Sequence, residues 1–130
     1  RNDFEVLYKD VCLGFDKSNT NIVGIPMLPK PMIESWLMGD SNAYLSVFGR
    51  LPSNPPLPIR PEELRGNKSD PTSNYAKNYL SRVLSQYPPH QEGWSFEIAQ
   101  NSNPDTLCYT CPTSYGRFLQ DVLCYLSTAT

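Results

Sequence analysis

The sequence predicts an α/β domain that is predominantly helical, with a small sheet or sheet remnant packed against about five helices. Three observations lead to this class. The chain has 130 residues, a length typical of one domain with its own core. Apolar residues recur at helical spacing in several segments. Residues 21–25 have the one convincing pattern of a buried strand, because they are short, β-branched and bounded by turn residues.

The first part of the chain combines helical and turn signals. Residues 3–15 predict an amphipathic helix, whose apolar stripe is Phe4, Leu7, Tyr8, Val11 and Cys12. After the strand, Pro29 and Pro31 break the chain, and Pro31 suits the first turn of a helix. Residues 32–48 predict two helices or one kinked helix, with Asp40 or Ser41 capping the second.

Prolines shape the middle of the chain. The sequence has 13 of them, about twice the average usage, so residues 49–59 are expected to form an extended loop. Residues 61–64 predict a one-turn helix that begins at proline. Residues 70–73 carry a helix-start signature, and the apolar stripe of the following helix is Tyr75, Tyr79, Leu80, Val83 and Leu84.

The last part of the chain is partly ambiguous. Residues 94–100 fit a short helix or a strand, and residues 104–110 are equally open. Residues 114–127 predict a closing helix.

Composition narrows the partners and the compartment. A net charge of -2 gives no support for strong nonspecific nucleic-acid binding by the domain as a whole, although a local basic patch is compatible with it. No apolar run is long enough to predict a membrane span. Four cysteines are compatible with reduced thiols, and we therefore expect a cytoplasmic protein.

Two carboxylates are candidates for a metal site. Glu34 is expected near the end of the strand and within a turn of a helix start, where a carboxylate can bind Mg²⁺ or act as a general base. From the pattern alone, a role as a partner of the helix dipole is favoured. Asp40 lies six residues further, about 240° around a helix, so capping is favoured over a metal site shared with Glu34.

A basic segment is the candidate nucleic-acid contact. Its cations could contact phosphates beside Tyr75 and Tyr79, which could stack on bases. An ordinary solvated helix face explains the same residues, and we favour it. The cations are Arg60, Arg65, Lys68, Lys77 and Arg82.

Cys108 and Cys111 have the spacing of a redox or zinc pair. A zinc site would need two more ligands, and we favour buried structural thiols instead. His90 is the single histidine and lies in a proline-rich loop with no visible catalytic partner.

Several short motifs resemble those of TOPRIM-related bacterial defence proteins of the RloB-like and OLD-like kind. Residues 33–40 (Ile-Glu-Ser-Trp-Leu-Met-Gly-Asp) resemble the family's "IE-x-WL-x-x-D" segment, which follows a strand that ends in proline. Residues 111–115 (Cys-Pro-Thr-Ser-Tyr), followed by Phe118, resemble an element that precedes a closing helix. Residues 61–64 and 75–77 resemble a "PE-x-L" helix start and a helix that bears Tyr and Lys. The likeness covers about residues 20–126.

The resemblance implies a Mg²⁺-dependent nuclease that acts with an ATPase partner. Glu34 would contribute to the acidic site or border it, with Asp40 as a further metal ligand, and Lys68, Lys77 and Arg82 would contact nucleic acid. TOPRIM domains also use an Asp-x-Asp pair, which this sequence lacks. The chain begins at Arg1 without a methionine, so we expect it to be the C-terminal part of a longer protein and inactive alone.

The alternative hypothesis is a noncatalytic protein-interaction module. In that interpretation Trp36, Trp94 and the proline-rich residues 52–61 dock a partner protein.

Overall fold

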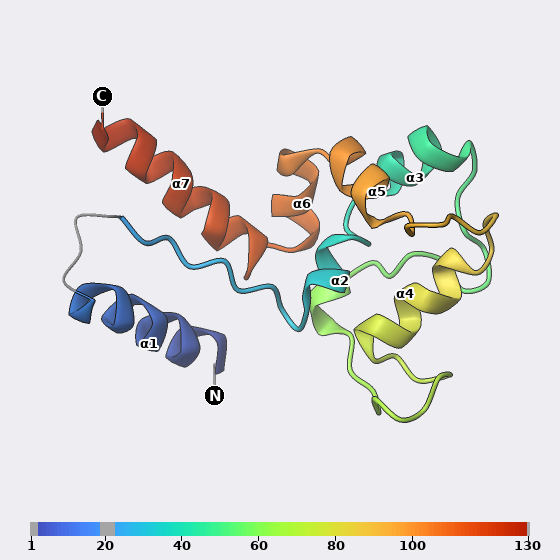
Figure 1. The fold of residues 1–130 in the computed structure, drawn as a ribbon, viewed down its shortest axis with the longest axis horizontal. Helices are drawn as coiled ribbons and strands as arrows, with labels where there is room; N and C mark the ends of the chain where they lie inside the picture. Colours follow the sequence, from blue (N-terminus) through green and yellow to red (C-terminus); the bar gives the residue numbers. More distant parts are fainter. Residues whose placement is uncertain (1–2, 19–22, 130) are drawn as a thin grey trace.

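The computed structural model describes residues 3–18 and 23–129, and these residues are predominantly helical (Figure 1). Within them, seven α-helices and one 3-10 helix, η1, follow one another along the chain. Their bounds are α1 (Asp3–Lys17), α2 (Ile33–Trp36), α3 (Ser41–Phe48), η1 (Pro61–Glu63), α4 (Ala76–Leu84), α5 (Ser95–Asn101), α6 (Pro104–Thr110) and α7 (Tyr115–Ala129).

The predicted sheet is the part of the fold class that the structure does not show. Residues 23–29 have no strand assignment, and no strand occurs elsewhere in the described ranges 3–18 and 23–129. Asn21 and Ile22, the first two residues of the predicted strand, lie outside those ranges. The predominantly helical prediction is confirmed, with more helices than the expected five.

The core lies in the part of the molecule built from α2, α3, α4 and α5. Helix α3 packs against α5, and α2 packs against α4. The largest fully buried apolar side chains there are Tyr44, Met38, Ile98 and Val83. Helix α4 contributes Ala76, Leu80 and Val83, which lie on one face because they are spaced by three or four residues.

Of the two alternatives predicted for residues 32–48, the structure has two helices, α2 and α3, instead of one kinked helix. Asp40 caps α3, since its side chain accepts a hydrogen bond from the N–H of Asn42 at 2.9 Å. Gly49 ends α3 at φ 77, a left-handed conformation that glycine adopts without steric cost.

The predicted helix start at residues 70–73 is wrong. Asp70 accepts hydrogen bonds from the N–H and hydroxyl of Thr72 at 2.9 and 2.7 Å, which closes a local turn. Helix α4 begins later, at Ala76. The two ambiguous segments, 94–100 and 104–110, fold as helices α5 and α6.

Helices α1 and α7 form a second part of the molecule, on the left of Figure 1, and residues 23–32 run between them. Polar contacts join the helices: Arg117 pairs with Glu5 at 2.8 Å, and the hydroxyl of Tyr8 donates to Asp121 at 2.5 Å. No helix of the described chain is both long and apolar enough to cross a membrane.

Candidate functional site

A cavity of about 600 Å³ opens beside η1, within the size range of small-molecule and peptide pockets. Four segments supply its walls: the end of the segment that precedes α2, the proline-rich loop, η1, and the end of α6 with the turn into α7. We call it the η1 cavity. Its lining residues are Lys30, Ile59, Arg60, Glu62, Glu63, Tyr109, Thr110, Pro112 and Thr113.

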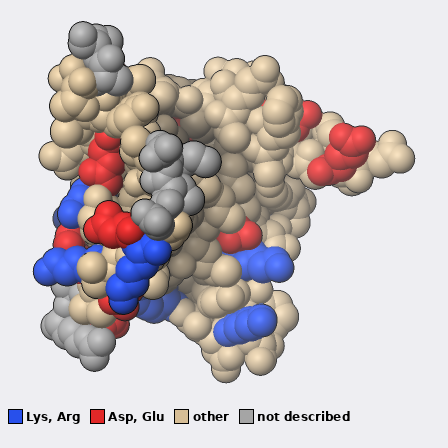
Figure 2. Space-filling model, turned by 60° about the vertical axis from the view of Figure 1, so that its left-hand side comes forward, with Lys and Arg blue, Asp and Glu red and all other residues tan. Residues whose placement is uncertain are grey.

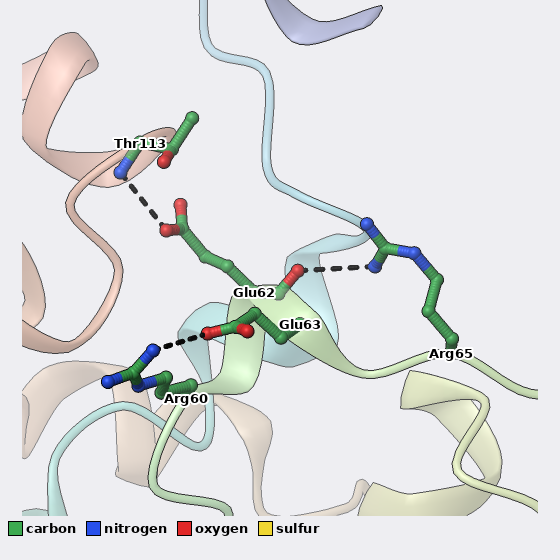
Figure 3. A network of polar contacts seen from close by, with 5 residues as sticks. All are labelled: Arg60, Glu62, Glu63, Arg65 and Thr113. Atoms are coloured by element: carbon green, nitrogen blue, oxygen red, sulfur yellow. Dashed lines mark hydrogen bonds and ion pairs between the residues drawn. The ribbon is translucent and has the colours of Figure 1, made fainter. Parts of the chain in front are cut away.

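Glu62 anchors the floor of the η1 cavity. Its side chain reaches toward the turn before α7 (Figure 3). There it accepts hydrogen bonds from the N–H groups of Thr113 and Ser114, at 3.0 and 2.5 Å, and from the Ser114 hydroxyl at 2.6 Å. The Ser114 oxygen in turn accepts from Trp36 Nε1 at 2.8 Å. This buried carboxylate therefore ties η1 to α2 and to the start of α7.

The rim of the η1 cavity carries two unusually exposed apolar side chains. Ile59 is 88% exposed and Tyr109 is 87% exposed, the highest values among the large hydrophobic residues described. Arg60 pairs with Glu63 at 3.3 Å, with 76% and 63% of these side chains exposed. Lys30 makes no hydrogen bond or ion pair with the described residues. The rim thus combines exposed apolar side chains with two cations, Arg60 in an exposed ion pair and Lys30 without a partner among the described residues.

The proline-rich loop is held in place by Gln86. The Gln86 side-chain oxygen accepts from the N–H groups of Ser53 and Asn54 at 2.9 and 3.0 Å, and its amide nitrogen donates to the Pro55 carbonyl at 2.9 Å. The Tyr79 hydroxyl donates to the Pro56 carbonyl at 2.5 Å. The loop that carries Ile59 is therefore ordered before any partner binds.

The structure separates the two candidate metal ligands by their surroundings. Asp40 is 2% exposed, and its second oxygen accepts from the N–H of Asn103 at 2.7 Å, so it joins α3 to the start of α6. Glu34 is half-buried in the first turn of α2 and has no hydrogen-bond or ion-pair partner among the described residues. Within those residues, no group of three His, Cys, Asp or Glu side chains could hold a metal ion.

The candidate nucleic-acid residues also differ from one another. Arg82 Nη1 donates to the carbonyls of Pro71 and Ser73 at 2.6 and 2.8 Å, and its guanidinium lies 5.3 Å from the Tyr79 ring centroid. Arg82 therefore holds the loop before α4. Lys68 and Lys77 are exposed. Figure 2, which brings the α1 and α7 end forward, shows acidic and basic side chains intermixed on that face.

The cysteines of the Cys-x-x-Cys pair are free thiols, as are Cys12 and Cys124. Burial raises the pKa of Cys111 to about 11, and burial followed by the charge of Asp105 raises the pKa of Cys108. Because the thiolate is the reactive form, the raised pKa of each thiol lowers its reactivity below that of an ordinary cysteine.

The interaction hypothesis is wrong for Trp36 as an exposed docking residue and stays a prediction for Trp94. Trp36 is buried and packs edge-on against Tyr115, with 4.9 Å between the ring centroids. Trp94 is half-buried between Phe48 and His90, and its ring N–H donates to the Pro88 carbonyl at 2.9 Å. His90 has partners that its loop position did not reveal, since its Nε2 lies 3.4 Å from Glu97.

Residues 23–29 are the second unusual feature, and we call them the open segment. Their main-chain N–H and C=O groups make no hydrogen bond with the described residues. Gly24 lies against α1, where an added Cβ would come within 2.4 Å of the Phe15 ring. The segment also borders a cavity of about 260 Å³ that residues of both α1 and α7 line.

Burial varies along the open segment. Its half-buried residues are Gly24, Ile25, Leu28 and Pro29. Val23 and Met27 are 55% and 54% exposed, whereas Pro26 between them is buried. The segment thus exposes two large apolar side chains, and its main chain has no pairing partner among the described residues.

Comparison with protein-family models, with the curated proteins and with the solved structures gives no match to this chain. The resemblance to TOPRIM-related proteins therefore stays a prediction, and the functional argument depends on the geometry described above.

Proposed function

We propose that this chain is the C-terminal segment of a TOPRIM-related, metal-dependent nuclease, inactive alone, and that its open segment is one strand of a small sheet. The other strands would come from the rest of that protein. The observation that carries the proposal is the set of main-chain groups of residues 23–29 that lack hydrogen bonds. Main-chain groups that become buried nearly always pair, so further strands that cover this segment would supply the partners that solvent supplies here.

The surroundings of the open segment support this proposal. It runs between two helices (Figure 1), as strands do in α/β sheets whose faces are covered by helices. Both helices also leave large apolar side chains half-exposed, which neighbouring strands would cover. These side chains are Val6, Leu7, Leu13, Leu123 and Leu126.

Glu34 is the residue that this proposal assigns to the acidic site. It follows the open segment in the chain, and its carboxylate has no partner in the described structure. Carboxylate oxygens are the ligands that Mg²⁺ prefers. One carboxylate is not a site, so the remaining ligands would come from the rest of the protein. Asp40 as a ligand would use the lone pairs that its two main-chain hydrogen bonds leave free.

The test of the Glu34 assignment is DNA cleavage by the protein purified from its native source. We expect Glu34→Gln to lower the Mg²⁺-dependent rate by about 100-fold or more, because it removes a metal ligand. Glu92→Gln, at an exposed loop carboxylate, is the matched control and should leave the rate unchanged. Equal rates and equal Mg²⁺ affinity for Glu34→Gln and wild type would contradict the assignment.

The same proposal includes nucleic acid and an ATPase as partners. It assigns Lys68 and Lys77 to contacts with the phosphates of the nucleic acid. A lysine that neutralises one phosphate contributes about 0.9 to the slope of log affinity against log salt. Lys68→Gln and Lys77→Gln should therefore each reduce that slope by about one. We expect Arg82 to act indirectly, through the loop that it holds. An unchanged slope in both lysine variants would remove them from the interface.

A protein-interaction module is the second candidate function, and one observation favours it. Ile59 and Tyr109 stand exposed on the two sides of the η1 cavity, which is the arrangement of anchor residues at a docking site. A photo-crosslinking amino acid at position 109 should then join the chain to one protein partner in the native cell. The same group at position 96, where Phe96 is 72% exposed on α5, is the control. Identical cross-links from both positions would contradict docking at the cavity.

A further inference from the structure

We infer that the η1 cavity binds an extended peptide segment of a partner protein in which a single carboxylate lies beside an apolar or aromatic side chain. This inference deepens the interaction-module candidate and rests on it. It does not depend on the nuclease proposal, because none of the residues assigned there to metal or nucleic acid lines the cavity.

The cations of the cavity are available for a carboxylate. Lys30 has no partner in the described structure. Arg60 has one ion-pair partner, Glu63, in a solvent-exposed pair of the kind that contributes little to stability. A ligand carboxylate can therefore replace Glu63 at little cost and bind the guanidinium through two parallel hydrogen bonds.

The charge balance of the lining favours one carboxylate over a phosphate. Lys30 and Arg60 supply two positive charges, and Glu62 and Glu63 supply two negative charges, so the lining is formally neutral. A phosphate group, which carries up to about two negative charges at neutral pH, would meet two carboxylates there. Glu62 is fixed by its three hydrogen bonds and cannot turn away.

The apolar rim completes the recognition. Ile59 and Tyr109 come from different segments, so a ligand side chain can lie between them. Their supports are already ordered: Gln86 and Tyr79 hold the proline-rich loop, and Tyr109 is on helix α6. A preorganised surface loses less conformational entropy on binding, so even a short peptide can bind to it.

The probe that tests the inference is a library of randomised heptapeptides displayed on phage and selected on the chain. We expect the enriched peptides to share one Asp or Glu next to an aromatic or large aliphatic residue. A synthetic copy should shift the NMR amide signals of Ile59, Arg60 and Tyr109. Replacing its acid by the matching amide should weaken binding by about tenfold or more.

Matched variants locate the binding. Tyr109→Ser and Lys30→Gln should each lower the affinity for the selected peptide by about fivefold or more. Phe96→Ser and Lys9→Gln, which change exposed residues outside the cavity, should not. All four side chains lack a hydrogen bond or ion pair within the described structure, so the variants are expected to fold.

Three results would overturn the inference. They are enrichment of no peptide, enrichment of peptides whose binding does not need the acid, and displacement of the peptide by a ten-nucleotide thymidine oligonucleotide. The second result leaves the interaction module in place with a different ligand chemistry. Failure of the cross-link from position 109, in contrast, removes the interaction module itself.

Discussion

Replacing Glu62 by Gln tests whether the buried carboxylate holds the fold together. Its Oε2 accepts two hydrogen bonds from Ser114 and its Oε1 accepts one from Thr113. An amide keeps one oxygen and puts an NH2 group in the other position, so at least one buried donor loses its acceptor. A hydrogen bond to a charged group contributes about 1.5–3 kcal/mol, and an unsatisfied buried donor costs about 1–3 kcal/mol.

We therefore expect Glu62→Gln to lower the free energy of unfolding by about 2–4 kcal/mol, a large part of the stability of a domain. Urea unfolding followed by tryptophan fluorescence measures it, and Trp36 reports directly because it donates to Ser114. The control is Glu63→Gln, at the exposed pair with Arg60, which should change stability by about 0.5 kcal/mol or less.

The opposite result for Glu62 would also be informative. If the desolvation cost of a buried carboxylate exceeds the energy of its hydrogen bonds, neutralising the carboxylate stabilises the folded protein. A gain in stability for Glu62→Gln, or a loss no larger than that of Glu63→Gln, would refute the structural role of this network.

Three further predictions follow from other contacts. Asp40→Asn should lower the free energy of unfolding by about 1–2 kcal/mol, because it removes the charge with which Asp40 caps α3 and holds the start of α6. The control in the same denaturant titrations is Asp105→Asn, at an exposed residue, which should have a smaller effect. The hydrogen bond to Asp121 is the main cause that raises the pKa of Tyr8 to about 12. The stabilising contribution of this hydrogen bond is therefore complete below pH 10 and is lost between about pH 10 and 12. Tyr8→Phe should abolish this part of the pH dependence in thermal unfolding, and an unchanged profile would contradict the contact. Exposed Cys124 should react with a thiol reagent about 100-fold faster than Cys111, which is fully buried and has a pKa of about 11; equal rates in a mass-resolved time course would show that Cys111 is accessible.

Local signals explain which elements the sequence could predict. Residues 3–15 and 114–127 carry long apolar stripes and form α1 and α7. Asp40 could be predicted as a cap because its partner Asn42 is two residues away. The start of α4 was misplaced because Asp70 uses the same short-range hydrogen bonding to close a turn instead of a helix.

The η1 cavity and its floor could not be predicted in the same way. Glu62 meets Ser114 across 52 positions of the chain, and Trp36 meets Ser114 across 78. No spacing rule links such residues. The sequence therefore places Glu62 only within a predicted one-turn helix and gives no sign of its distant partners. The exposure of Ile59 and Tyr109 likewise depends on how the loop and α6 pack. The one available signal was the cluster of prolines, which indicated an ordered loop.

Amide hydrogen exchange of the protein from its native source tests the central claim most directly. If the open segment is a paired strand, the amides of Val23, Ile25 and Met27, which share one edge, should exchange at least about 100-fold more slowly than in an unstructured peptide. In the 130-residue chain alone, where these groups have no partner in the described structure, they should exchange rapidly. Rapid exchange in both proteins would show that no further strand pairs with residues 23–29, and would contradict the claim.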